Sequence, residues 1–141
     1  VAVDIETGKV SILKNAGCYD GGTPVNPQMC EGQIEGGMVM GIGAALFEKQ
    51  VFDEKGKLLN ANFHDYHIPT AEDLPENARN IAMLAPVPHP EGPFGAKGIG
   101  EVSIIPTAPA ISNAIYHATG VRIKELPITA EKILLALKAR L

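Results

Sequence analysis

Glycine is concentrated in two short parts of this chain, and that concentration constrains the fold more than any other sequence feature. Nine of the 15 glycines lie within residues 32–43 and 92–100, where an even distribution would place about two. Each glycine costs a helix roughly 1 kcal/mol relative to alanine, and a domain has only ~5–15 kcal/mol of net stability. We therefore expect both segments to serve close approach, either of another part of the backbone or of a ligand.

The first glycine window lies within a predicted helix. Asn26 is a suitable N-cap and Pro27 a suitable first helical residue. Apolar residues then recur every fourth position, which is typical of a buried helix face, at Ile34, Met38, Ile42 and Leu46. The pairs Gly32–Gly36 and Gly37–Gly41 are also spaced by four, so each pair shares a face. The spacing fits packing within this domain and a ligand surface equally well.

The remaining pattern mixes strands and helices. Alternating segments at 1–5 and 9–13 with Gly8 between them predict a β-hairpin, and 51–59 predicts a second one around Gly56. Residues 15–27 are rich in turn formers and predict a loop. Strands are expected at 65–68, 81–87 and 121–126, and helices at 106–118, ended by Gly120, and after the cap Thr129. This predicts a single α+β domain over 1–141, with two or three helices packed on a mixed sheet in two layers.

Composition limits the classes of partner. The net charge is −4 and no basic run occurs, so neither nucleic acid nor an anionic membrane is an expected partner. The longest apolar stretch, near residues 36–47, is shorter than the ~20 residues that a membrane-spanning helix needs. The cysteines, Cys18 and Cys30, have no metal-site spacing and suggest reduced thiols in a cytoplasmic protein. The chain begins at Val1, inside a strand pattern, so we expect either a processed chain or a piece of a longer polypeptide.

The second glycine window ends at a single acid, in the sequence GPFGAKGIGE of residues 92–101. It lacks the Gly-Lys-Ser/Thr of a phosphate loop and the glycine order of dinucleotide-binding folds. Glu101 closes the glycine run and precedes an apolar segment, so partial desolvation is expected to raise its pKa and suit it to general-base catalysis. A surface acid, or one at the start of a helix, would fit the same pattern.

Gln33 is a second candidate, because an amide among these glycines can both donate and accept hydrogen bonds. That chemistry suits the edge of a heteroaromatic ring or a metal-bound oxygen, although an ordinary solvated glutamine has the same spacing. His64 and His67 form an H-x-x-H pair without a nearby third ligand, which favours plain loop histidines over zinc. Lys97 suits an anionic group of a cofactor or an ion pair with a neighbouring acid.

Six motifs follow one another along nearly the whole chain, and each is weak alone. They are VDIETGKV at 3–10, DGGTPVNP at 20–27, GQIEGGMVMGIG at 32–43, NFHDYHIPTAEDLP at 62–75, GAKGIGE at 95–101 and ATGVRIKELPIT at 118–129. In this order they resemble the C-terminal part of the molybdenum-binding subunit or domain of the xanthine dehydrogenase/aldehyde oxidase family.

The resemblance implies a role for particular residues. Glu101 matches the glutamate that acts as general base in that family, which hydroxylates a purine, N-heteroaromatic or aldehyde carbon with oxygen derived from water. Gln33 matches a glutamine that lies against the molybdenum–pyranopterin cofactor. Gly98, Ile99 and Gly100 match the loop that passes close to that cofactor. No residue of this chain is expected to ligate the metal.

The resemblance also implies partners outside this chain. They are the remainder of the molybdenum-binding subunit, iron–sulfur and flavin (FAD) domains or subunits, a small-molecule substrate and further copies in a homo-oligomeric parent enzyme. The family residues that read the substrate lie earlier in the parent sequence, so the isolated chain is expected to be inactive. The alternative is a non-catalytic assembly domain of a degenerate family member. A phosphate-binding domain is disfavoured because the second glycine window has the wrong motif.

Overall fold

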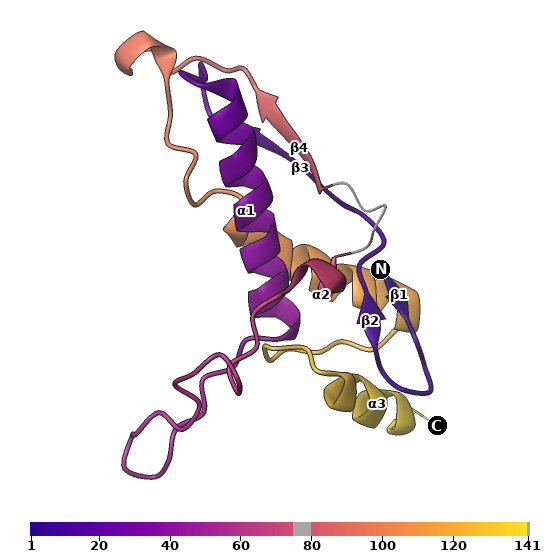
Figure 1. Ribbon diagram of the computed structural model, residues 1–141. Coiled ribbons are helices and arrows are strands. Elements are labelled where there is room, and N and C mark those ends of the chain that lie inside the picture. Colours follow the sequence, from indigo (N-terminus) through magenta and orange to yellow (C-terminus); the bar gives the residue numbers. More distant parts are fainter. Residues whose placement is uncertain (75–79, 141) are drawn as a thin grey trace.

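Figure 1 shows the computed structural model, which describes residues 1–74 and 80–140. The described residues contain three α-helices, two short 3-10 helices (Ala71–Asp73 and Pro93–Gly95) and two small sheets, so the α+β expectation is confirmed. The expected mixed sheet is instead two separate two-stranded sheets, one antiparallel and one parallel. In chain order the elements are β1 (Ala2–Val3), β2 (Val10–Ser11), β3 (Asn15–Asp20), α1 (Pro27–Leu46), β4 (Asn80–Ala85), α2 (Ile104–Thr119) and α3 (Ala130–Lys138).

The predicted first hairpin is present. Strands β1 and β2 pair antiparallel, with Val3 opposite Val10. The carboxylate of Asp4 accepts a hydrogen bond from the Glu6 amide at 2.8 Å, which organises the turn. Gly8 has a φ of 73°, a left-handed conformation that glycine adopts without a steric penalty. The hairpin therefore forms for the local reasons that the sequence indicates.

The segment 15–20 was predicted as a loop, and this prediction is wrong. Residues Asn15–Asp20 form strand β3, which pairs in parallel with β4 and sets Cys18 opposite Met83. A parallel pair joins segments far apart in the chain, so turn-forming residues in one strand are outweighed by a partner that local patterns do not reveal. Strand β4 (Asn80–Ala85) overlaps the segment 81–87 where a strand was expected, but it begins one residue earlier and ends two residues earlier.

Helix α1 begins and packs as its sequence predicts. The Asn26 side chain accepts a hydrogen bond from the Met29 amide at 3.1 Å, and Pro27 is the first helical residue. The apolar seam is buried along its length, at Ile34, Met38, Ile42 and Leu46. Helix α2 ends at Gly120, which has a left-handed φ of 72°, and Thr129 caps α3 by accepting from the Lys132 amide. These helix boundaries are therefore confirmed.

Two further predicted strands, 65–68 and 121–126, are not present. In the first segment, the Tyr66 hydroxyl donates a hydrogen bond to the Glu48 carboxylate at 2.6 Å. This segment is therefore held by a side-chain contact and not by backbone pairing with a strand. In the second, Val121 is buried and Ile123 packs on the core, but no described strand lies alongside. Apolar alternation alone does not make a strand where no neighbour completes the ladder.

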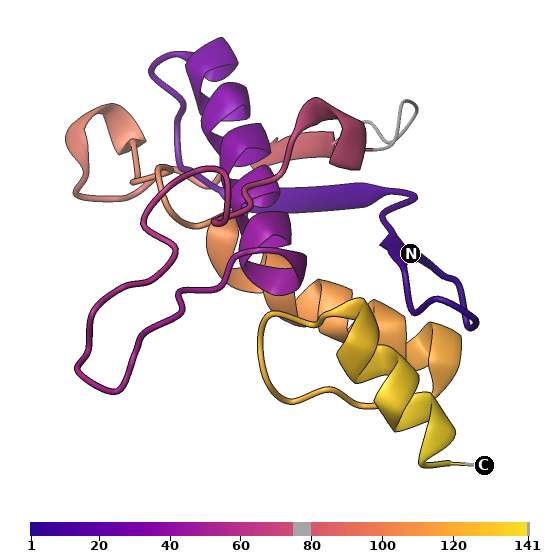
Figure 2. The same ribbon diagram turned by 60° about the horizontal axis from the view of Figure 1, so that its bottom comes forward.

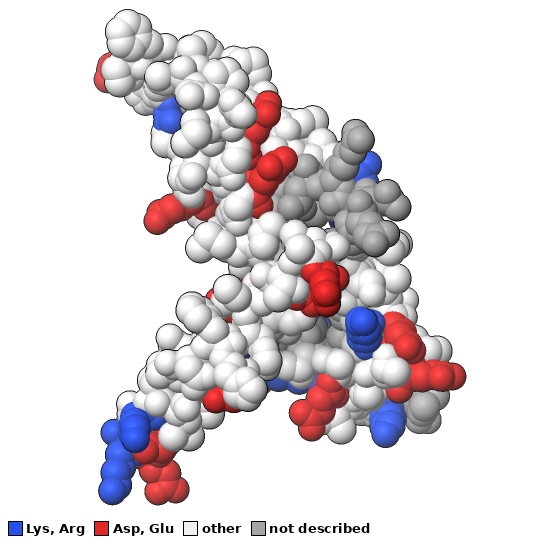
Figure 3. All heavy atoms as spheres, viewed as in Figure 1, with Lys and Arg blue, Asp and Glu red and all other residues white. Residues whose placement is uncertain are grey.

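The expected second hairpin is reduced to a turn. Gly56 has a φ of 78°, and the Asp53 amide donates to the Lys57 carbonyl at 3.0 Å. Pairing beyond the turn is limited to an isolated bridge between Phe52 and Leu58. This turn lies at the end of an arm, residues 48–70, that extends away from the helices (Figure 2). Lysines and acids lie side by side at the end of the arm in the space-filling view of Figure 3.

The core forms where the C-terminal half of α1 crosses α2 and meets α3. Its buried members come from β2 and its flank, the helices, and the segment before α3, namely Ile12, Ile42, Ala45, Leu46, Ile111, Ile115, Ile128 and Ile133. The Ile128 amide donates to the Ala45 carbonyl, which ties the segment before α3 to α1. The N-terminal half of α1 projects beyond this core, and the second glycine window lies beside it (Figure 1).

Candidate functional site

The second glycine window is attached to the segment that precedes α1. The Thr23 amide donates to the Gly95 carbonyl at 2.9 Å, and the Lys97 amide donates to the Gly21 carbonyl at 3.1 Å. Gly22 and Ala96 form an antiparallel bridge between the same two segments. These backbone bonds hold residues 95–97 against the entrance of the helix, so the two glycine windows lie together in space although about 50 residues separate them in sequence.

Lys97 and Asp20 strengthen this attachment. The Lys97 Nζ lies 2.6 Å from the Asp20 Oδ2, and the Gly22 amide donates to the other carboxylate oxygen at 3.1 Å. The hydrogen bond from Lys97, and then that from the Gly22 amide, lower the pKa of Asp20 below its ordinary value of 3.8. Of the two roles open to Lys97, the structure shows the ion pair with a neighbouring acid.

Gln33 and Gly100 are brought together by this arrangement. A methyl group placed on Gly100 would lie 3.9 Å from the Oε1 atom of Gln33. Gln33, Gly98 and Gly100 are exposed, while Ile99 is half-buried. The Ile99 side chain contacts the position where Gly21 would carry a methyl group, so Ile99 anchors the loop inward. Three of the four residues expected at the cofactor are therefore exposed, and the fourth, Ile99, holds the loop against the rest of the chain.

The glycines of α1 divide in the same way. A methyl group on Gly37 would lie 2.0 Å from the Ser103 hydroxyl oxygen, and one on Gly41 would lie 2.5 Å from the Thr107 Cβ, so this pair exists for close packing against α2. Methyl groups on Gly32 and Gly36 would meet nothing within 4 Å. The two pairs that share four-residue spacing thus serve different faces: one packs within this chain, and the other is open.

We use the term glycine face for the open glycines of both windows together with the Gln33 side chain, which lies beside Gly100. It consists of Gly32, Gln33 and Gly36 on α1 together with Gly98 and Gly100 on the loop. A methyl group on Gly98 would also meet nothing within 4 Å. No contact among the described residues accounts for these glycines, although two of them lower the stability of α1. A flat group approaching from outside would account for them.

Glu101 directly follows Gly100 and therefore lies at the edge of the glycine face. Its carbonyl accepts a hydrogen bond from the Ile104 amide at 3.2 Å, which fixes the backbone where the chain turns into α2. Its side chain is exposed. The desolvation that the sequence suggested for this carboxylate is not supplied by the described residues, because burial depends on neighbours from other parts of a structure.

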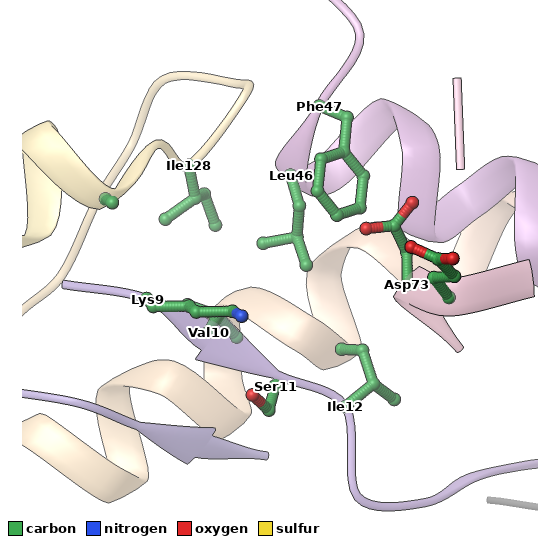
Figure 4. Close-up of a pocket in the computed structure, with 10 residues that line it drawn as sticks. Lys9, Val10, Ser11, Ile12, Leu46, Phe47, Asp73 and Ile128 are labelled. Atoms are coloured by element: carbon green, nitrogen blue, oxygen red, sulfur yellow. The ribbon is translucent and has the colours of Figure 1, made fainter. Parts of the chain in front are cut away.

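Two cavities lie at opposite ends of α1. The first, of ≈ 260 Å³, borders the glycine face, and its lining includes Met29, Gln33 and Ile99. The second, of ≈ 360 Å³, lies where α1 ends, and Figure 4 shows Lys9 and Asp73 on opposite sides with Leu46 between them. The second cavity contains no residue that the sequence marked as functional, so the predicted chemistry gathers at the N-terminal end of α1.

The histidines and cysteines form no metal site within the described residues. No group of three or more His, Cys, Asp or Glu side chains is placed to hold an ion there. His64 and His67 are both exposed on the arm. Cys18 and Cys30 are unbonded to each other. No helix of residues 1–74 and 80–140 combines the length and apolarity required to cross a membrane.

Sequence reasoning missed Ser103, which lies two residues after Glu101 and is fully buried. Its hydroxyl is 3.4 Å from the Gln33 carbonyl oxygen, to which it donates. The available signal was a pair of small residues, Ser103 and Thr107, with the same four-residue spacing as Gly37 and Gly41. That match identifies a helix crossing only once the two helices are known to be neighbours.

Comparisons with known proteins agree with this arrangement. Residues 1–75 match the molybdopterin cofactor-binding domain family. A xanthine dehydrogenase molybdenum-binding subunit of Escherichia coli O157:H7 is 42% identical over 134 residues, covering 94% of this chain and 17% of that protein. The aldehyde oxidoreductase molybdenum-binding subunit PaoC of Escherichia coli (strain K12) is 34% identical over 135 residues, covering 95% of this chain and 18% of that protein.

A solved structure shows the same fold. The aldehyde oxidoreductase from Desulfovibrio gigas matches with a TM-score of 0.84 and 38% identity, covering 96% of this chain and 14% of that one. The chain therefore belongs to the molybdopterin cofactor-binding domain family, among molybdenum hydroxylases of the xanthine dehydrogenase and aldehyde oxidase type. It spans less than a fifth of the length of these relatives.

Proposed function

We propose that this chain forms one wall of the cofactor site in a molybdenum hydroxylase that oxidises a purine, N-heteroaromatic or aldehyde carbon. The observation that carries the proposal is the glycine face, which joins Gln33 on α1 to Gly98 and Gly100 on the loop. Its glycines have no packing role within the described residues, and Glu101 stands at its edge. Relatives that are named molybdenum-binding subunits support the same assignment.

The residues of the glycine face fit a pyranopterin. Absence of side chains at Gly32 and Gly36 permits van der Waals contact with a flat ring system. The exposed amide of Gln33 offers both a donor and an acceptor to heteroatoms at the ring edge. Gly98 and Gly100 would lie against the cofactor, with Ile99 holding their loop in place through its contact at Gly21.

Glu101 is assigned the general base. When bound, the molybdenum centre supplies two-electron oxidation and activates oxygen derived from water. In the parent enzyme the Glu101 carboxylate would accept a proton from the water-derived oxygen during hydroxylation of the substrate carbon. Because the side chain is exposed in this chain, its enclosure in the parent enzyme comes from the remainder of the parent subunit and from the substrate.

The other parts of the enzyme lie outside these residues. Residues 1–141 act as one domain of a longer subunit, and the earlier part of that subunit completes the cofactor site and reads the substrate. Iron–sulfur and FAD domains or subunits carry the electrons onward, in a parent enzyme that is a homo-oligomer. The names of the relatives as molybdenum-binding subunits support the presence of companion subunits in the parent enzyme.

The test is the Glu101→Gln substitution in the full-length parent enzyme. Removing a positioned base should lower turnover by roughly 10²–10⁴-fold, while molybdenum content stays unchanged because no role in holding the metal is assigned to Glu101. Glu91→Gln is the matched control, since it removes the charge of another exposed acid in the adjoining loop. Near-normal turnover of the Glu101→Gln enzyme would refute the base assignment, whereas a parent enzyme that shows no turnover even with Glu101 present would favour the non-catalytic assembly role.

A further inference from the structure

Ser103 connects the two elements that carry the proposed site. It lies immediately before α2, two residues after Glu101, and its side chain is fully buried. Its hydroxyl donates to the Gln33 carbonyl oxygen across the interface at 3.4 Å. Ser103 is thus bonded to the backbone of Gln33 and separated from Glu101 by a single residue.

The backbone of Ser103 is held from two further directions. Its carbonyl oxygen accepts a hydrogen bond from the Thr107 hydroxyl at 2.8 Å, within α2. The same oxygen accepts a longer bond from the Tyr19 hydroxyl on β3, at 3.4 Å. Three elements, α1, α2 and β3, therefore meet at this residue. Each bond fixes the turn from which the Glu101 side chain emerges.

Packing leaves Ser103 little freedom to move. It occupies the space that a side chain on Gly37 would need, because a methyl group there would lie 2.0 Å from the Ser103 hydroxyl oxygen and 3.1 Å from its Cβ. Thr107 occupies the corresponding space at Gly41, one helical turn further from Glu101. Ser103 and Thr107 thus form two successive contacts of the same type, of which only the first adjoins the proposed site.

We propose that Ser103 is a positioning residue that sets the separation between Gln33 and Glu101. This inference rests on the proposed function. Gly100 already lies alongside the Gln33 side chain, so a shift of the turn at Ser103 relative to α1 changes the gap between the amide and the carboxylate. Misplacement of a catalytic group by about 1 Å costs up to roughly 10²-fold in rate, so a small shift at this contact is enough to alter turnover.

The experiment compares Ser103→Ala with Thr107→Ser in the full-length parent enzyme. Ser103→Ala removes the hydroxyl that reaches Gln33 and keeps the Cβ, whereas Thr107→Ser keeps its hydroxyl and removes a methyl group from the same helix crossing. We expect Ser103→Ala to lower kcat by roughly tenfold and to shift the acidic limb of the pH profile. Molybdenum content should hold steady on purification but fall more quickly than in Thr107→Ser during dialysis, because Gln33 is less well placed. Thr107→Ser should retain the parent kcat and pH profile.

The outcomes separate this inference from the proposed function. If Glu101→Gln is inactive and Ser103→Ala behaves as Thr107→Ser does, the positioning role is wrong and the general base stands. If Glu101→Gln is active, both proposals are wrong. Should Ser103→Ala fold poorly, the double variant Ser103→Gly with Gly37→Ala replaces it. In this variant the new methyl group at residue 37 takes the space of the Ser103 side chain, so the interface stays filled but the hydroxyl is absent. We expect the double variant to lose kcat to the same extent as Ser103→Ala. A double variant with the kcat and pH profile of the parent enzyme would overturn the inference.

Discussion

At the scale of single residues, what a side chain can do in this chain depends on the contacts that position it as well as on its residue type. Gln33 lies beside Gly100, and Glu101 is held by its backbone at the edge of the glycine face. Lys97 carries a charge that suits an anionic group of a cofactor, yet it is paired with Asp20 at 2.6 Å. Its role is to fasten the loop on which the proposed base is carried.

The Asp20–Lys97 pair leads to a prediction about pH. The pKa of Asp20 is lowered in the folded chain, chiefly by the Lys97 hydrogen bond, so the pair stabilises the fold above the ordinary value of 3.8. That contribution is lost as the pH falls below 3.8 through the lowered pKa. Lys97→Met should raise the pKa of Asp20 toward its ordinary value, as measured by NMR titration of the carboxyl carbon.

Asp4 provides an internal control in the same titration. Its pKa is also lowered, but by amide and hydroxyl groups of its own turn, at Glu6 and Thr7. Lys97→Met should therefore leave the titration of Asp4 unchanged. An Asp20 pKa that did not move would show that the ion pair contributes nothing in solution, as is found for many exposed pairs.

At the scale of elements, helix α1 uses glycine for two purposes on two faces. Gly37 and Gly41 receive Ser103 and Thr107 of α2, which brings the two backbones close together. Gly32 and Gly36 face open space, because a methyl group on either residue would meet no atom of the described residues within 4 Å. Glycines with the same spacing thus permit close helix packing at Gly37 and Gly41 and leave open space at Gly32 and Gly36.

This division predicts opposite signs for two similar substitutions. Gly37→Ala should destabilise the chain by about 1–3 kcal/mol, since the new methyl group overlaps Ser103. Gly36→Ala should stabilise it by up to about 1 kcal/mol, because alanine favours the helix and meets nothing there. The free energy of unfolding from urea titrations of each variant measures both effects. Equal destabilisation by the two substitutions would contradict the division into faces.

The glycine face predicts a further contrast in the parent enzyme. Gly36→Ala should lower the molybdenum content although it stabilises the helix, because its methyl group occupies the clearance assigned to the cofactor. Ala44 is an exposed position on the same helix, and Ala44→Ser supplies a control change that should leave the molybdenum content as it was. A fully loaded and stable Gly36→Ala enzyme would place the cofactor elsewhere.

At the scale of the whole molecule, the proposed cofactor site extends beyond this chain. It spans 17% of a related molybdenum-binding subunit, and the glycine face is exposed rather than enclosed. A cofactor that contacts one wall only loses most of the burial that gives a pocket its affinity. The proposed activity therefore belongs to the parent enzyme, in which a second wall faces this one.

This leads to a prediction for the isolated chain of 141 residues. When produced in cells that make the molybdenum cofactor, it should purify without stoichiometric molybdenum and should not oxidise aldehydes or purines. Elemental analysis of the purified protein measures the first point, and substrate-dependent dye reduction measures the second. Molybdenum bound at one equivalent would mean that a single wall holds the cofactor, contrary to the proposal.

Helix ends could be predicted from the sequence more reliably than strands, for a physical reason. Helix ends depend on residues within a turn of them, so Asn26, Gly120 and Thr129 could be recognised in the sequence and have the expected roles. Strand β3 depends on a partner more than 60 residues away, and residues 121–126 lack one. The candidate residues Gln33, Gly98, Ile99, Gly100 and Glu101 came from motifs, and their roles stay predictions.

The sequence by itself determined the buried seam of α1, the turns at Gly8 and Gly56, the helix caps and the clustering of glycine, because each depends on neighbouring residues in the chain. Only the tertiary structure decided which glycines are filled and which are open, that Lys97 pairs with Asp20, and that Ser103 joins Gln33 to the turn after Glu101. The reason is that a glycine has the same sequence pattern whether its missing side chain makes room for a helix or for a cofactor. The distinction depends on what lies opposite, and that is set by packing between segments distant in the chain.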